Sequence, residues 1–139
     1  MNVLTYPMPM ILPTTGASKP RRVGAARQPL VIMENVVEYI GDDPDIQRQV
    51  FDLCLDLLRE SLPRLDQAIA KGDVATVRQL AHKARGSLGM LGMPALRELS
   101  EDIEYRYDSL GLARWQQRCH ELKDMFEDLQ LELQDRLAA

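Results

Sequence analysis

The chain has 139 residues, with 17 Lys and Arg against 21 Asp and Glu, a net charge of -4, and 5% aromatic residues. This length suits one domain, and the acidic balance with few aromatic side chains disfavours nucleic-acid binding as the main activity. The only cysteines, Cys54 and Cys119, exclude a disulfide framework, and with two histidines they cannot form a CxxC-type zinc site.

The first part of the chain differs in charge from the rest. Residues 1–33 hold four of the 17 basic residues and none of the 21 acidic ones, so they carry +4 against -8 for the remainder. They also hold five of the eight prolines and show no sustained apolar period. We expect residues 1–30 to form a disordered, proline-rich basic tail or linker, and residues 31–139 to form the folded domain. The basic residues follow the apolar stretch instead of preceding it, which is unlike a signal peptide, and no run of about 18 apolar residues predicts a membrane span.

Helical spacing begins at residue 31. A short apolar stripe predicts a helix over 32–40 that Gly41 ends. Asp43 before a proline is a strong helix start, and the stripe that follows predicts a helix over 44–71. Pro63 lies inside this helix, so we expect a kink there or a break into two pieces.

Three further helices follow at short intervals. Asp73 caps a predicted helix over 74–91, and Gly92 ends it. The next stripes predict helices over 94–110 and 115–137. No segment alternates like a strand, and short loops make neighbouring helices antiparallel. The predicted fold is therefore all-α, an antiparallel up-down four-helix bundle with a short additional N-terminal helix. Both cysteines, Trp115 and Phe126 fall on apolar stripes and are predicted to be buried.

The two histidines differ in position. At about 100° per residue, the apolar residues of the 74–91 helix point within roughly 60° of the direction opposite His82. His82 is therefore predicted at the centre of the solvent-exposed face, whereas His120 lies one residue past a stripe position and is interpreted as an ordinary surface histidine. Offsets of -4, +3, +4 and +7 place four axial neighbours beside His82 on its face: Arg78, Arg85, Gly86 and Gly89.

Glycine inside a helix costs about 1 kcal/mol relative to alanine. Two glycines on an exposed face therefore suggest that another molecule approaches the imidazole closely. Arg85 and Arg78 are placed to hold an anion on or near the ring through charge-assisted hydrogen bonds. Gln79 is a candidate hydrogen-bond donor at the rim, and Lys83, about 100° around the helix, is a candidate docking residue.

The run Ala81-His82-Lys83-Ala84-Arg85-Gly86-Ser87, continuing to Gly92, Leu96, Leu99 and Glu104, closely resembles histidine-containing phosphotransfer (HPt) domains of bacterial two-component phosphorelays. The signature of these domains is an Ala-His pair, a basic residue with Gly-Ser at +3 to +5, and a further Gly at +10. The resemblance spans about residues 31–139. The basic residue is usually lysine in the family and is Arg85 here, so a planar fork replaces a point charge.

The resemblance implies a phosphoryl carrier and not an enzyme with its own turnover. His82, through Nε2, would accept a phosphoryl group from the aspartyl phosphate of a receiver domain and pass it to another receiver. The implied partners are receiver domains and a hybrid sensor kinase, with no nucleic acid, no membrane contact, no cofactor and no metal of its own. We expect a cytoplasmic protein, monomeric in the absence of any strong dimerisation pattern.

Three alternatives remain at the level of sequence. The chain is also consistent with the HPt fragment of a hybrid sensor kinase, because an interdomain linker would look like residues 1–30. A receiver-binding module without phosphate is disfavoured by the presence of His82. A metal-binding bundle is the weakest alternative, because neither histidine lies on an apolar stripe and the apolar faces hold no acidic residues.

Overall fold

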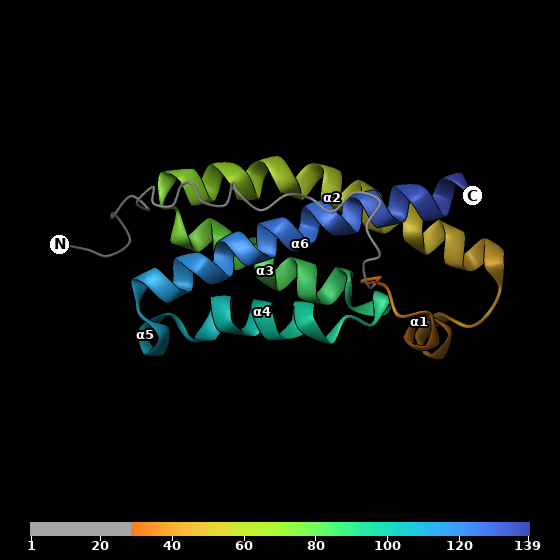
Figure 1. Ribbon diagram of the computed structural model, residues 1–139, viewed down its shortest axis with the longest axis horizontal. Coiled ribbons are helices and arrows are strands. Elements are labelled where there is room, and N and C mark those ends of the chain that lie inside the picture. The colour runs from red at the N-terminus through yellow and green to blue at the C-terminus, as the bar shows by residue number, and fades with distance from the viewer. Residues whose placement is uncertain (1–28) are drawn as a thin grey trace.

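The computed structural model describes residues 29–139, and all regular structure in that range is helical. Four long helices form the bundle: α2 (Pro44–Lys71), α3 (Val74–Ser87), α4 (Pro94–Tyr105) and α6 (Leu112–Ala138). The short α1 (Met33–Ile40) precedes them, η3 (Gly89–Leu91) follows α3, and α5 (Tyr107–Leu110) joins α4 to α6 (Figure 1). The predicted all-α fold is confirmed. The prediction for residues 1–30 falls almost wholly on residues 1–28, which lie outside the described residues.

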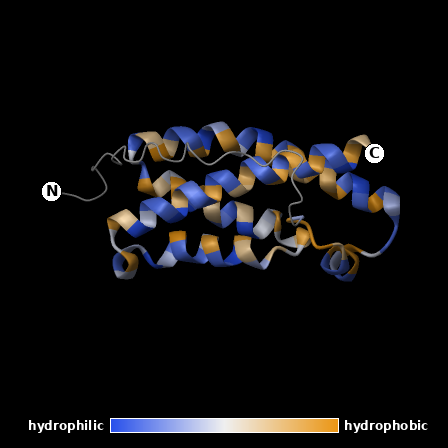
Figure 2. Cartoon of the chain, viewed as in Figure 1, coloured by the Kyte–Doolittle hydropathy of each residue, from blue (hydrophilic) through white to orange (hydrophobic). Residues whose placement is uncertain are grey.

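The four long helices pack as a ring in which α2 and α4 each contact both α3 and α6. Arg48 near the start of α2 donates a hydrogen bond to the Leu137 carbonyl near the end of α6. Asp66 near the end of α2 forms an ion pair with Lys123, which lies in the first half of α6, at 2.8 Å. These contacts make α2 and α6 antiparallel, as the sequence predicts. Hydrophobic and hydrophilic residues mix along the four long helices (Figure 2), because one face of each is packed inward.

The helix starts follow the predicted caps. The side chain of Asp43 accepts a hydrogen bond from the backbone N–H of Asp45, and that of Asp73 accepts one from the backbone N–H of Thr76. Hydrogen bonds from the Thr76 side chain and backbone hold the pKa of Asp73 below its usual value. Of the kink or break predicted at Pro63, the break is wrong, because α2 runs through this exposed proline as one helix.

Helix α3 ends earlier than predicted. It stops at Ser87, and two leucines reach the core from beyond the α-helix: Leu88 from the residue that links it to η3, and Leu91 from the 3₁₀ turn itself. The glycine at each end of that turn explains the difference, since glycine is a weak helix former. Gly89 is consequently not an axial neighbour of His82 on α3, although it is exposed.

The predicted helix over 94–110 is divided at Arg106. Two backbone carbonyls that a continuous helix would use internally are occupied by side chains from other helices. The indole Nε1 of Trp115 donates to the Ile103 carbonyl at 3.0 Å, and Nη2 of Arg78 donates to the Glu104 carbonyl at 2.7 Å. These tertiary hydrogen bonds satisfy the end of α4 and allow the chain to turn into α5.

The apolar stripes of the long helices form most of the core, but Leu53 on the predicted stripe of α2 is an exception. The largest fully buried side chains include Trp115 and Phe126, both of which the sequence predicts to be inside. Leu53 faces solvent, whereas its neighbour Cys54 is buried. Burial raises the pKa of the Cys54 thiol to about 11 and also raises that of Cys119, which agrees with their predicted role as small apolar residues.

Helix α1 is attached to the bundle by polar contacts in its first turn and in the residues just before it. The carboxylate of Glu132 on α6 accepts hydrogen bonds from the backbone N–H groups of Leu30 at 2.6 Å and Val31 at 3.0 Å. The amide of Asn35 donates to the Gly92 carbonyl at 3.1 Å. Helix α1 therefore packs over η3, at the end of α3.

We expect Gly92→Ala to lower the free energy of unfolding by about 2–3 kcal/mol. Gly92 has a φ of 64°, which disfavours any side chain, and an added Cβ would lie 2.1 Å from Cβ of Asn35. Chemical denaturation of the two proteins measures the difference. Gly89→Ala is the matched control, because a Cβ at Gly89 would have nothing within 4 Å. Equal losses in both variants would contradict this role for Gly92.

Candidate functional site

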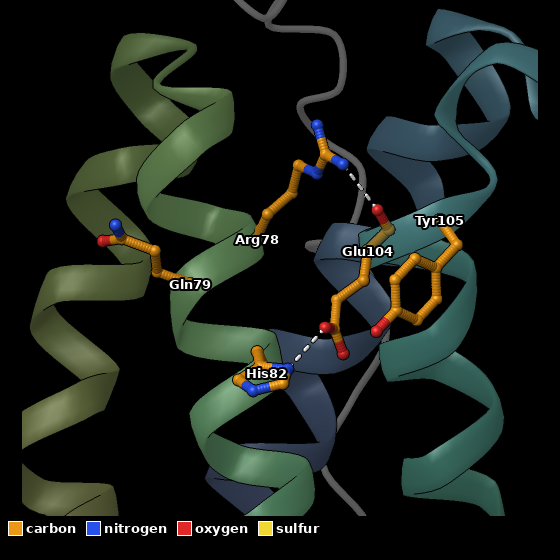
Figure 3. Close-up of a pocket in the computed structure, with 5 residues that line it drawn as sticks. All are labelled: Arg78, Gln79, His82, Glu104 and Tyr105. Carbon is orange, nitrogen blue, oxygen red and sulfur yellow. Dashed lines mark hydrogen bonds and ion pairs between the residues drawn. The ribbon is translucent and has the colours of Figure 1, made fainter.

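His82 lies on α3 with its ring turned toward α4. Its side chain is 67% exposed, which confirms the position predicted from helical spacing. Nδ1 lies 2.7 Å from Oε1 of Glu104, whose side chain is only 7% exposed (Figure 3). The histidine is therefore open to solvent on one side and held by a buried carboxylate on the other.

The distances around Nδ1 select one tautomer of His82. Nη2 of Arg85 also lies 3.3 Å from this nitrogen, and a guanidinium can only donate, but this contact is much longer than the one between Nδ1 and Glu104. If Nδ1 lacked a proton, its lone pair would face the carboxylate oxygen at 2.7 Å, which is repulsive. In the neutral ring Nδ1 therefore carries the proton and donates a hydrogen bond to Glu104, and the lone pair is on Nε2. Figure 3 shows Nε2 on the side of the ring away from Glu104.

Glu104 was part of the sequence resemblance, but its contact with His82 appears only in the structure. Residues 82 and 104 are 22 positions apart on two helices, so helical spacing cannot place them together. Glu104 is also the residue on which both flanking arginines converge. Arg85 Nε lies 3.2 Å from its Oε2 as an ion pair, and Arg78 binds its backbone carbonyl.

Arg85 has more partners than the sequence suggests. Its Nη2 lies 3.4 Å from Oε1 of Glu104 and donates to the hydroxyl of Tyr105 at 3.3 Å. Its guanidinium carbon is 5.8 Å from the centre of the Tyr105 ring, a cation–π distance. Glu101 adds an ion-pair contact at 3.9 Å. Arg85 is therefore held on the α4 side of the histidine and is only 28% exposed.

A shallow depression open to solvent surrounds the histidine. Its lining residues are Arg78, Gln79, His82, Glu104 and Tyr105. In Figure 3 the guanidinium of Arg78 extends toward the end of α4 and away from the imidazole, while Gln79 points away from Glu104. Tyr105 was not singled out from the sequence, since one exposed tyrosine after a helical stripe carries no specific signal.

The remaining predicted site residues lie around this depression. Lys83 is exposed and its Nζ is 3.9 Å from Oε1 of Glu60 on α2. Gly86 and Gly89 are exposed, and a Cβ added to either would have nothing within 4 Å, so the surface beside the histidine is open. Within residues 29–139 no group of three His, Cys, Asp or Glu side chains is placed to hold a metal ion.

Comparison with known families identifies the fold that carries this site. Residues 49–139, which run from the first turns of α2 to the end of α6, match the family model of the Hpt domain. The chain belongs to the Hpt domain family. The Hpt domain acts in histidine phosphotransfer of two-component signalling, as a phosphoryl carrier that interacts with receiver domains. The resemblance given by the residues around His82 is thereby confirmed at the level of the family. No curated protein and no solved structure matches the chain.

The second histidine of this Hpt domain has a different environment. His120 on α6 is partly buried, and its pKa is lowered by that burial and by the charge of Lys123.

A separate finding concerns membranes. The described helices include none that is long and apolar enough to cross a membrane.

Proposed function

We propose that His82 is the phosphorylated residue of this Hpt domain, accepting a phosphoryl group from the aspartyl phosphate of one receiver domain and passing it to another. The hydrogen bond from Nδ1 to Glu104 carries this proposal. It fixes the proton on the inner nitrogen, so the nucleophilic lone pair of Nε2 faces solvent. The proposal includes a cytoplasmic location, together with the receivers, and a monomeric carrier.

The transfer step needs only the imidazole of His82 and the aspartyl phosphate of the receiver as reacting groups. The lone pair of Nε2 forms a bond to phosphorus as the bond from phosphorus to the aspartate oxygen breaks, and the electron pair of that bond leaves with the aspartate as a carboxylate. The proton on Nδ1 stays in place, so the phosphorylated ring carries a positive charge. Glu104, at 2.7 Å, compensates that charge. The reverse sequence returns the phosphoryl group to a second receiver.

The exposed glycine beside the histidine supports the approach of a receiver. The aspartyl phosphate lies on the receiver, so parts of the receiver must come within bonding distance of an imidazole that lies close to the helix surface. Gly86, one turn beyond His82 on α3, leaves that approach unobstructed.

The proposal is tested by incubating the domain with a receiver that carries a radiolabelled phosphoryl group. We expect label on the Hpt domain that is lost in acid and stable in base, as a phosphohistidine is, and that returns to a second, unlabelled receiver. Peptide mapping should locate the label at His82. Absence of transfer, or label at another residue, would refute the proposal.

Gly86→Leu is expected to slow transfer at least about tenfold, because a side chain there keeps the receiver from the reacting geometry. The fold should be retained, since the added Cβ meets nothing within 4 Å and leucine is a better helix former than glycine. Single-turnover transfer rates and thermal denaturation measure the two effects.

Ala70→Leu, on the exposed surface of α2 near its end, is the control for an added leucine. It should transfer at the unmodified rate. Normal transfer by Gly86→Leu would show that the receiver does not approach over this glycine.

A further inference from the structure

Two basic side chains flank the imidazole on different sides, and this inference about them rests on the proposed phosphorylation of His82. Arg85 lies on the side of Nδ1, within 3.4 Å of both Glu104 and Tyr105 on α4. Lys83 lies on the side of α2, where its partner is Glu60. The phosphoryl group has only one of these sides to occupy.

The direction of Nε2 determines that side. The two nitrogens of an imidazole point to nearly opposite sides of the ring, and Nδ1 points at Glu104. A phosphoryl group on Nε2 would therefore extend away from α4. In Figure 3 Glu104 and Tyr105 lie on the Nδ1 side of the ring, and Nε2 faces the other way.

Arg85 is poorly placed to follow the phosphoryl group. To reach it, the guanidinium would have to leave the carboxylate of Glu104, which is the group that orients the ring. That movement would leave the buried Oε2 of Glu104 without its ion-pair partner. This oxygen has no hydrogen bond from the described residues and depends on the ion pair with Arg85. Arg85 is therefore suited to hold Glu104 in place.

Lys83 is held much more loosely. Its Nζ is 3.9 Å from Oε1 of Glu60, and the two side chains are 48% and 64% exposed. Exposed ion pairs at such a distance contribute little, so the ammonium can exchange this partner for a stronger one at small cost. Its flexible four-carbon stem allows it to reach the adjacent histidine, and an ammonium binds a phosphate as a point charge.

We propose that Lys83 binds the phosphoryl group on Nε2 of His82 and that Glu60 competes with the phosphoryl group for Lys83. Arg85 is then a positioning residue that acts through Glu104. Under this arrangement Glu60 regulates how strongly the domain retains its phosphoryl group.

The test compares the half-life of the phosphorylated domain after the receiver is removed, and the fraction phosphorylated at equilibrium with a receiver. Lys83→Gln should decrease both about three- to tenfold, and Glu60→Gln should increase both about two- to threefold. Arg59→Gln and Asp56→Asn make the same changes in charge within an exposed ion pair of α2, in which Asp56 lies one turn before Glu60. These controls should leave the half-life and the phosphorylated fraction unchanged. They separate the effect of Lys83 binding to the phosphoryl group from the effect of a change in the net charge of the domain.

Arg85→Gln gives a second readout. We expect it to change the ¹⁵N chemical shifts of the His82 ring, because the hold on Glu104 is weakened, whereas Lys83→Gln should leave those shifts unchanged. Two results together would overturn the assignment of Lys83 as the phosphoryl-binding residue. One is an unaltered phosphohistidine lifetime in Lys83→Gln. The other is a shortened lifetime with unchanged ring shifts in Arg85→Gln. Failure to label the unmodified domain would instead refute the proposed function, so the two failures are distinguishable.

Discussion

His82→Gln is expected to abolish the acid-labile, base-stable label completely. The glutamine amide is similar in length to the imidazole but has no nucleophilic lone pair, so no bond to phosphorus forms. The side chain is 67% exposed and makes no apolar contact that the core depends on, so the variant should fold normally. Transfer from a radiolabelled receiver measures the first expectation, and thermal denaturation measures the second.

His120→Gln provides the matched control. It makes the same substitution at the other histidine, which is partly buried on α6 and, among residues 29–139, has no hydrogen bond to a carboxylate such as His82 has to Glu104. This variant should be labelled as fully as the unmodified domain. Equal labelling of His82→Gln would exclude His82 as the phosphoryl acceptor, and loss of label in both variants would indicate damage to the receiver-binding surface instead.

Glu104→Ala is expected to reduce the transfer rate by about ten- to a hundredfold, by analogy with other groups that orient a reacting histidine. Without the carboxylate, Nδ1 has no acceptor, the ring populates both tautomers, and the charge on the phosphorylated imidazole is uncompensated. Glu104→Gln should lose less, because its amide oxygen can still accept the hydrogen bond from Nδ1. A graded order of rates, with glutamate fastest and alanine slowest, is the expected result.

A readout independent of activity distinguishes orientation from general disruption. The ¹⁵N shifts of the His82 ring should report the Nδ1–H tautomer in the unmodified domain and a mixture in Glu104→Ala. Glu101→Ala is the control, since Glu101 contacts Arg85 at 3.9 Å without contacting the histidine. Full activity of a folded Glu104→Ala variant, with an unchanged ring tautomer, would remove Glu104 from the mechanism.

Substitution of Glu104 is also expected to affect the free energy of unfolding. A carboxylate that is only 7% exposed is costly to bury unless it is paired, and here its partners are His82 and Arg85. Removing it leaves Arg85 without its nearest carboxylate. Denaturation curves for Glu104→Ala and Glu104→Gln therefore accompany the rate measurements, so that any loss of folded protein is taken into account.

Much of the fold could be predicted from local features of the sequence. Capping depends on residues within one turn of each other, so Asp43 and Asp73 mark the starts of α2 and α3 correctly. The same holds for the exposure of His82, because the face of a helix follows from the spacing of its apolar residues. The basic residue and the glycine that follow His82 by three and four positions also lie on that helix. These features are local, and a helix fixes local geometry.

The early end of α3 has a local cause in the glycines that follow it, but two other errors concern features that depend on distant residues. Nothing near residues 94–110 predicts an interruption at Arg106, because the hydrogen bonds that replace the helical ones come from Trp115 and Arg78. The expected break at Pro63 fails for the opposite reason, since packing of α2 along α6 maintains a helix that the proline weakens. Local propensity is a weak preference that tertiary contacts override.

By itself, the sequence determined that this protein is a helical bundle with one histidine on an open face beside a glycine and two arginines. Only the tertiary structure decided where each of those groups lies relative to the imidazole ring. The packing of α3 against α4 places Glu104 on Nδ1, holds Arg85 on the same side of the ring and leaves Nε2 on the side away from Glu104. The physical reason is that hydrogen bonds and ion pairs act over a few ångströms, and residues on different helices reach that distance only when the bundle is packed.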